Sequence, residues 1–388
     1  MSETKTKFSQ DCVVVLGMHR SGTSALAGML SLLGCATPAS LIKGDKNNEK
    51  GYFESNSVGR LSDKIMQELG SQWNDWLPLE FSALAANKRL DFGQKIQETI
   101  AAEYSETPLF VLKEPRICRM VPFWHDAIQA SGAKVHFVLT HRNPQEVATS
   151  LNRRDGFEPA YGYLLWMRHV LDAESATRGL PRIFTSYAQL MENWRGVVGK
   201  LDAGLGLPFA VDRKRATREI DGFLSQRLKH NTDVTEQTLR NPDLPKLLRD
   251  TFAVMERWAE SGEQTKDHAS LDALRVELDG LANVFGPLAR PGQMALLENQ
   301  RLGREDTDKR SQNTELNSAI AEVTRLRRVI NVKRGELKAL NQTLALRDNT
   351  LQEHLAEIDR LRSIITADEP PQEEHHADDT SRDKSIER

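Results

Sequence analysis

The chain has 388 residues, 39% hydrophobic and 28% charged, which is enough for two or three folded units. Its net charge of −3 argues against a general nucleic-acid binder, whose surface would be strongly basic. It has three cysteines without metal-ligand spacing, no apolar leader and no apolar run long enough to cross a membrane. These features predict a cytoplasmic protein with no metal site and no membrane span.

Short apolar runs that alternate with helical patterns predict an α/β domain over residues 10–285. We expect buried strands at 13–16, 109–112 and 135–139, and a weaker one at 182–185. Helices are expected after Gly22, from Pro144 at a suitable first-turn position, and over 157–178. The predicted fold is a P-loop-like parallel sheet flanked by helices.

The segment GMHRSGTS follows the first predicted strand and leads into a helix. Gly17 and Gly22 have the spacing of a Walker A loop, whose backbone N–H groups surround an anion. The hydroxyls of Ser21, Thr23 and Ser24 can donate to phosphate oxygens. The segment therefore predicts a phosphate-binding loop at a helix N-terminus.

The lysine of a Walker A loop is missing, because Thr23 stands in its place. The second and third strands lead into Lys113-Glu114 and His141-Arg142, so neither ends in the Asp that holds Mg²⁺ in nucleotide triphosphatases. An anhydride with less charge and no metal, held by Arg20 and the loop hydroxyls, fits these residues better.

GMHRSGTS resembles the phosphosulfate-binding loop of the sulfotransferase family, whose donor is 3′-phosphoadenosine 5′-phosphosulfate. Arg20 occupies the position that is lysine in the cytosolic members. An arginine at this position resembles many bacterial members. HRNPQEVATS resembles the family's second motif, in which an arginine and a later serine, here Arg142 and Ser150, grip the donor's 3′-phosphate. NNEKGYFES, LFVLKEPR and IDGFLSQRLKH resemble further segments of bacterial members, so the resemblance spans residues 12–230.

The resemblance implies direct, metal-independent transfer of a sulfuryl group to a hydroxyl or amine. Arg20 is expected to stabilise the charge that develops on the departing phosphate. The expected base is Glu54, with His125 as runner-up and Glu114 as a further possibility. The residues expected to bind the donor are His19, Arg20, Ser21, Gly22, Thr23, Ser24, Arg142 and Ser150.

On the acceptor side, Trp73 and Trp76 are candidates to stack on a sugar or another ring, and Glu54 is a further candidate to bind the acceptor. Lys113 and Arg116 are candidates to bind the donor or an anionic acceptor. For each the alternative is structural, since such tryptophans are often core residues and such cations often form ion pairs. By analogy with the family, a carbohydrate or glycolipid is the expected acceptor.

Beyond a predicted linker at 286–310, apolar residues recur every seven positions over a predicted coiled coil at 311–366. A second apolar series, interrupted by Lys333, Arg347 and His354, runs beside the first. This pattern predicts a homo-oligomer, the alternative being one amphipathic helix packed on its own domain. Residues 367–388 are expected to be a disordered acidic tail. The seven-residue series consists of Leu316, Val323, Ile330, Leu337, Leu344, Leu351, Ile358 and Ile365.

Two other function classes stay open at this point. A P-loop kinase or nucleotide triphosphatase would bind ATP with Mg²⁺. A catalytically inactive scaffold would oligomerise through the coiled coil and retain only a vestigial pocket.

Overall fold

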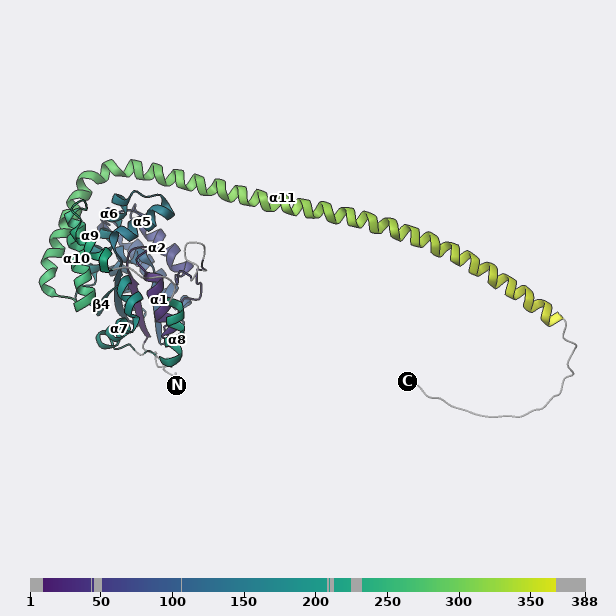
Figure 1. The fold of residues 1–388 in the computed structure, drawn as a ribbon, viewed down its shortest axis with the longest axis horizontal. Helices are drawn as coiled ribbons and strands as arrows, with labels where there is room; N and C mark the ends of the chain where they lie inside the picture. Colours follow the sequence, from purple (N-terminus) through teal and green to yellow (C-terminus); the bar gives the residue numbers. More distant parts are fainter. Residues whose placement is uncertain are drawn as a thin grey trace, which may run out of the picture. The chain divides into compact units, whose positions relative to one another are not determined.

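The structure, a computed structural model, describes residues 10–42, 44, 51–105, 107–207, 209, 213–224 and 232–367. The chain divides into two compact units, Met1–Gly292 and Gln293–Arg388. In the first unit, strands alternate with helices as the sequence predicts (Figure 1). Its strands are β1 (Gln10–Leu16), β2 (Leu109–Lys113), β3 (Ala133–His141) and β4 (Arg182–Ser186).

The four strands form one parallel sheet in the order β2-β1-β3-β4. From β1 the chain crosses to β2 on one side, and it later returns to β3 on the other side of β1. In open α/β sheets, ligands bind outside the carboxyl ends of the strands where the strand order reverses in this way. The topology therefore predicts a ligand site at the segments that follow β1 and β3.

Helices cover both faces of the sheet. Side chains of β1 alternate between two apolar clusters, with Cys12, Val14 and Leu16 in one and Val13 and Val15 in the other. The second cluster is completed by α1 (Thr23–Leu32), α7 (Tyr187–Leu205) and α8 (Arg213–Leu224). The first takes its apolar residues mainly from α2 (Asn56–Glu68), α3 (Ala86–Glu103), α4 (Val121–Ala130), α5 (Pro144–Asp155), α6 (Pro159–Ala176) and α10 (Lys246–Ser261).

Capping side chains fix where the helices at the sheet's carboxyl edge begin. Asn143 accepts a hydrogen bond from the backbone N–H of Gln145 at 2.9 Å, and α5 begins with Pro144 as predicted. Ser186 caps α7 in the same manner, 3.2 Å from the N–H of Gln189. The remaining elements are η1 (Phe81–Ala83), η2 (Pro115–Arg119), α9 (Thr232–Arg240) and η3 (Thr265–Asp267).

The last helix, α11, runs from His268 to Ala367. Its first turns bury Leu271, Leu274 and Leu278 in the first apolar cluster. Residues 286–310, predicted as a linker, are helical. Of the predicted acidic tail, 368–388 lies outside the described residues.

Candidate functional site

The loop between β1 and α1 turns so tightly that two positions require glycine. A Cβ at Gly17 would lie 2.4 Å from the Thr140 carbonyl oxygen on neighbouring β3. Gly22 has a left-handed φ of +84°, and its Cβ would lie 2.2 Å from the Tyr187 ring. The two glycines therefore let the loop approach the end of β3 and the start of α7 closely.

Arg20 also has a left-handed backbone, with φ of +70°, which is uncommon for a residue other than glycine. Its Nε donates to Ser150 Oγ on α5 at 2.8 Å. Burial lowers the pKa of Arg20, and Arg154 and Arg142 lower it further. This hydrogen bond links the loop to α5, and the expected grip of Ser150 on the same phosphate as Arg142 stays a prediction.

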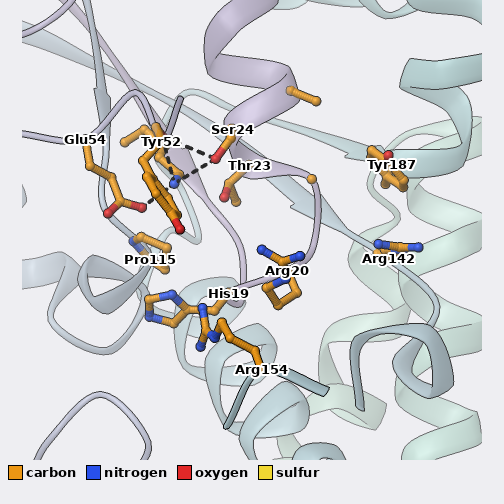
Figure 2. A pocket seen from close by; sticks show the side chains of 13 residues that line it. His19, Arg20, Thr23, Ser24, Tyr52, Glu54, Pro115, Arg142, Arg154 and Tyr187 are labelled. Carbon is orange, nitrogen blue, oxygen red and sulfur yellow. Dashed lines mark hydrogen bonds and ion pairs between the residues drawn. The ribbon is translucent and has the colours of Figure 1, made fainter. Parts of the chain in front are cut away.

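Arg20 lines a pocket of about 170 Å³ together with twelve other residues (Figure 2). Four of these thirteen side chains are Lys or Arg, and one is a carboxylate. Such a surplus of positive charge suits a ligand with several negative charges. The lining residues are His19, Arg20, Gly22, Thr23, Ser24, Ala25, Tyr52, Glu54, Lys113, Pro115, Arg142, Arg154 and Tyr187.

A lysine does reach the loop, but from β2 and not from α1. The Lys113 ammonium donates to Ser24 Oγ at 3.2 Å and to the Tyr52 carbonyl at 3.1 Å, and forms an ion pair with Glu54. Lys113 is 3% and Glu54 12% exposed, so the pair is almost shielded from water. The two predicted residues thus come together on one wall of the pocket.

Arg142 and Tyr187 form the opposite wall. The Arg142 guanidinium lies 4.8 Å from the centre of the Tyr187 ring and pairs with Glu146 at 2.7 Å. In Figure 2, Arg20 and Thr23 lie between this wall and Glu54. Tyr187 was not predicted as a site residue, because its place depends on β4 lying next to β3.

His19 lies at the edge of the pocket, its ring 4.8 Å from that of Trp73. Burial, then the charges of Arg154 and Arg116, hold its pKa well below the usual range, so the imidazole is neutral. Its Nε2 is buried and has no hydrogen-bond partner in the described part of the chain. The hydroxyl of Ser21 is buried and lacks a partner there as well, so both residues retain polar atoms for other interactions.

Six predicted site residues do not line the pocket: Ser21 and Ser150, described above, and Trp73, Trp76, Arg116 and His125. Trp73 contacts two of the lining residues, with its ring 4.8 Å from that of His19 and 5.1 Å from the Arg154 guanidinium. Trp76 is 3% exposed in the core, where its carbonyl accepts from Arg168 at 2.7 Å. Arg116 forms ion pairs with Glu114 at 2.8 Å and Asp63 at 2.9 Å.

His125 is the last of these residues. It lies on α4, 3.1 Å from Asp126 and with its ring 6.0 Å from that of Phe137. A base must reach the proton that it removes, and His125 does not line the pocket, so a catalytic His125 stays a prediction without support from this geometry. The sequence alone could not show on which face of the sheet the helix that carries His125 packs.

The described residues contain no group of three or more His, Cys, Asp or Glu side chains arranged to hold a metal ion. Nor does any helix in the described ranges have the length and apolar character to cross a membrane.

No family model and no curated protein matches this sequence. Among solved structures, the chain is similar to the sulfotransferase domain from the curacin biosynthetic pathway, with 17% identity and a TM-score of 0.36. It is similar to the sulfotransferase domain of the Synechococcus PCC 7002 olefin synthase, with 18% identity and a TM-score of 0.37. The alignments cover 66% and 67% of this chain, and 99% and 98% of those domains.

A third similar structure is sulfotransferase STF1 from Mycobacterium tuberculosis H37Rv, with 13% identity and a TM-score of 0.32. It is aligned over 63% of this chain and 77% of that one. Likenesses of this size do not establish a shared activity, which has to be inferred from the pocket itself.

Proposed function

We propose that the chain transfers a sulfuryl group from 3′-phosphoadenosine 5′-phosphosulfate to a hydroxyl or amine of an acceptor. The observation that supports this most is the cationic pocket where the loop after β1 meets Arg142 at the end of β3. A donor with a phosphosulfate at one end and a phosphate at the other requires two separate anion sites. The loop with Arg20 and Lys113 offers one, and Arg142 offers the other.

The donor supplies the sulfuryl group and a phosphate that leaves as an anion. Loop N–H groups at the start of α1 and the guanidinium of Arg20 are fixed donors for that anion. Lys113, bonded to Ser24 of the loop, adds a second cation at the same end. Arg142 and the Tyr187 ring would hold the nucleoside end with its 3′-phosphate.

Glu54 is the proposed base. As the acceptor oxygen or nitrogen forms its bond to sulfur, its proton passes to the Glu54 carboxylate. The bond between sulfur and the phosphate oxygen breaks, and its electron pair stays on the phosphate beside Arg20 and Lys113. Because Lys113 contacts both Glu54 and Ser24, one ammonium positions the base relative to the anion site.

The acceptor would enter on the Glu54 side of the pocket, past His19, Pro115 and Arg154. The neutral His19 ring has a nitrogen for an acceptor hydroxyl. A carbohydrate or glycolipid acceptor is part of this proposal, and rests on the sequence resemblance alone. A cytoplasmic location stays a prediction from the cysteine content.

Transfer of ³⁵S from the labelled donor to a panel of carbohydrates, glycolipids and amino sugars tests the proposal. Wild type should label at least one acceptor without added metal. Glu54→Gln should reduce the rate about 10²- to 10⁴-fold, the usual contribution of a positioned base, while the donor still binds. Glu98→Gln, at an exposed position of α3, is the matched control and should behave as wild type. Transfer of ³²P from ATP in place of ³⁵S would contradict the proposal.

A further inference from the structure

One face of α11 carries apolar side chains that nothing in the described chain covers. The eight residues of the seven-residue series between Leu316 and Ile365 are each 47–65% exposed. At 1.5 Å per residue, this stripe is about 75 Å long. Exposed apolar stripes of that length are stable in water only when another helix covers them.

The composition of the stripe favours one partner helix. In heptad notation the series occupies position a, and half of its members are the β-branched residues Val323, Ile330, Ile358 and Ile365. Position d holds leucine at 326, 340 and 361. Branched residues at a with leucine at d favour two parallel strands over three or four.

Charges beside the stripe indicate the direction of that partner. The charged residues at position g are all acidic, whereas those at e are three arginines and Asp348. In a parallel pair, each g residue faces the e residue of the partner's next heptad. An antiparallel pair would instead place g against g and e against e, which brings like charges together. The acidic g residues are Glu315, Glu322, Glu336 and Glu357, and the basic e residues are Arg327, Arg334 and Arg362.

We propose that residues 316–365 pair with the same segment of a second copy in a parallel, in-register, two-stranded coiled coil. Glu322 then faces Arg327 of the second copy, and Glu357 faces its Arg362. Zero offset also brings all eight a-position layers together, which no shifted register does. The inference stands independently of sulfuryl transfer.

Lys333, Arg347 and His354 occupy d positions and would each face their own counterpart. Lys333 already pairs with Glu336 of its own helix at 2.6 Å. Lysine and arginine can cover a seam with their stems while their charges reach water, most easily in a two-stranded coil. These residues weaken the pair without reversing its direction.

Cysteine cross-linking of the full chain tests the pairing. Leu316→Cys and Ile365→Cys, oxidised separately, should each give a disulfide-linked dimer. Ala321→Cys and Ala356→Cys lie on the opposite face of the helix and should give none. The native Cys12, Cys35 and Cys118 are buried, so wild type is the blank. Sedimentation of unoxidised wild type should give twice the 43.7 kDa of one chain.

Other outcomes would overturn the proposal. Cross-linking only in a mixture of Leu316→Cys and Ile365→Cys means an antiparallel pair. A mass of one chain, or of three or more, excludes the two-stranded coil. Charge reversal gives a second test: Arg327→Glu should weaken dimerisation several-fold, and adding Glu322→Arg should restore it. A double variant no tighter than the single one contradicts the g-to-e contact.

Discussion

Glu114 shows how the end of β2 controls the charge of the site. Its carboxylate is fully buried and accepts hydrogen bonds from the backbone and side chain of Arg116, at 3.1 and 2.8 Å. Burial raises the pKa of Glu114 to about 7, although Arg116 opposes the shift, and the charge of nearby Glu54 raises it further. Arg116 is engaged here and with Asp63, and it does not line the pocket.

This raised pKa predicts a pH-dependent stability. Between its ordinary 4.5 and about 7, folded Glu114 holds a proton that the unfolded chain releases. The contribution of this group to the free energy of unfolding therefore falls as pH rises through that window, and is constant above it. Relative to wild type, Glu114→Gln should gain stability between pH 5 and pH 8. Urea denaturation of both proteins at the two pH values measures this.

The difference between the free energies of unfolding of the two proteins cancels the contributions of groups that titrate in both. Glu98→Gln, at an exposed position of α3, should show the same pH profile as wild type. Parallel profiles for wild type and Glu114→Gln would mean that the carboxyl titrates alike in the folded and unfolded chains.

At the scale of elements, the loop after β1 depends on the start of α7. Gly22→Ala would force a side chain into the left-handed region and against the Tyr187 ring. We expect adenosine 3′,5′-bisphosphate affinity to fall at least tenfold, since Tyr187 and the loop line one pocket. Calorimetry on the folded variant measures the affinity.

Gly156→Ala separates backbone strain from the contact with Tyr187. The φ of Gly156 is +72°, close to that of Gly22, but a Cβ at Gly156 would meet nothing within 4 Å. It should lose stability and keep its affinity. An equal loss of affinity in both variants would show that the Tyr187 contact is not the cause.

The elements themselves were largely predictable from the sequence. Four apolar runs marked the strands to within a few residues, because a strand buried on both faces is apolar throughout. Glycine spacing marked the loop, and Pro144 marked the start of α5. These signals are local and need no knowledge of the neighbouring elements.

What the sequence did not reveal was the pairing of side chains across elements. Lys113 and Glu54 are 59 residues apart, and Arg154 and Tyr187 enter the pocket from two further elements. Their meeting depends on the strand order β2-β1-β3-β4, which apolar runs do not specify. For the same reason, Trp76 and His125 could be named as candidates but not located.

For the whole molecule, we expect that dimerisation through α11 can be abolished without loss of nucleotide binding. Every residue that lines the pocket lies between His19 and Tyr187, whereas the proposed seam begins at Leu316. In the full chain, Leu337→Glu with Leu344→Glu should give monomers by sedimentation, because two charged layers would be buried at the seam. Affinity for adenosine 3′,5′-bisphosphate should not change.

Leu346→Glu is the control, because this residue is 68% exposed and lies away from the seam. It should remain dimeric. Loss of nucleotide binding along with the dimer would instead show that the second copy contributes to the site.

The most direct measurement compares the calorimetric binding of adenosine 3′,5′-bisphosphate and ATP, each with and without Mg²⁺. Wild type should bind the bisphosphate more tightly, and equally well without the metal. Arg142→Ala should weaken it roughly ten- to hundredfold, the effect of a lost charge-assisted hydrogen bond. Arg195→Ala, whose guanidinium lies over Trp194 outside the pocket, should not. Tighter binding of ATP with Mg²⁺ would contradict the assignment of the pocket to a sulfuryl donor.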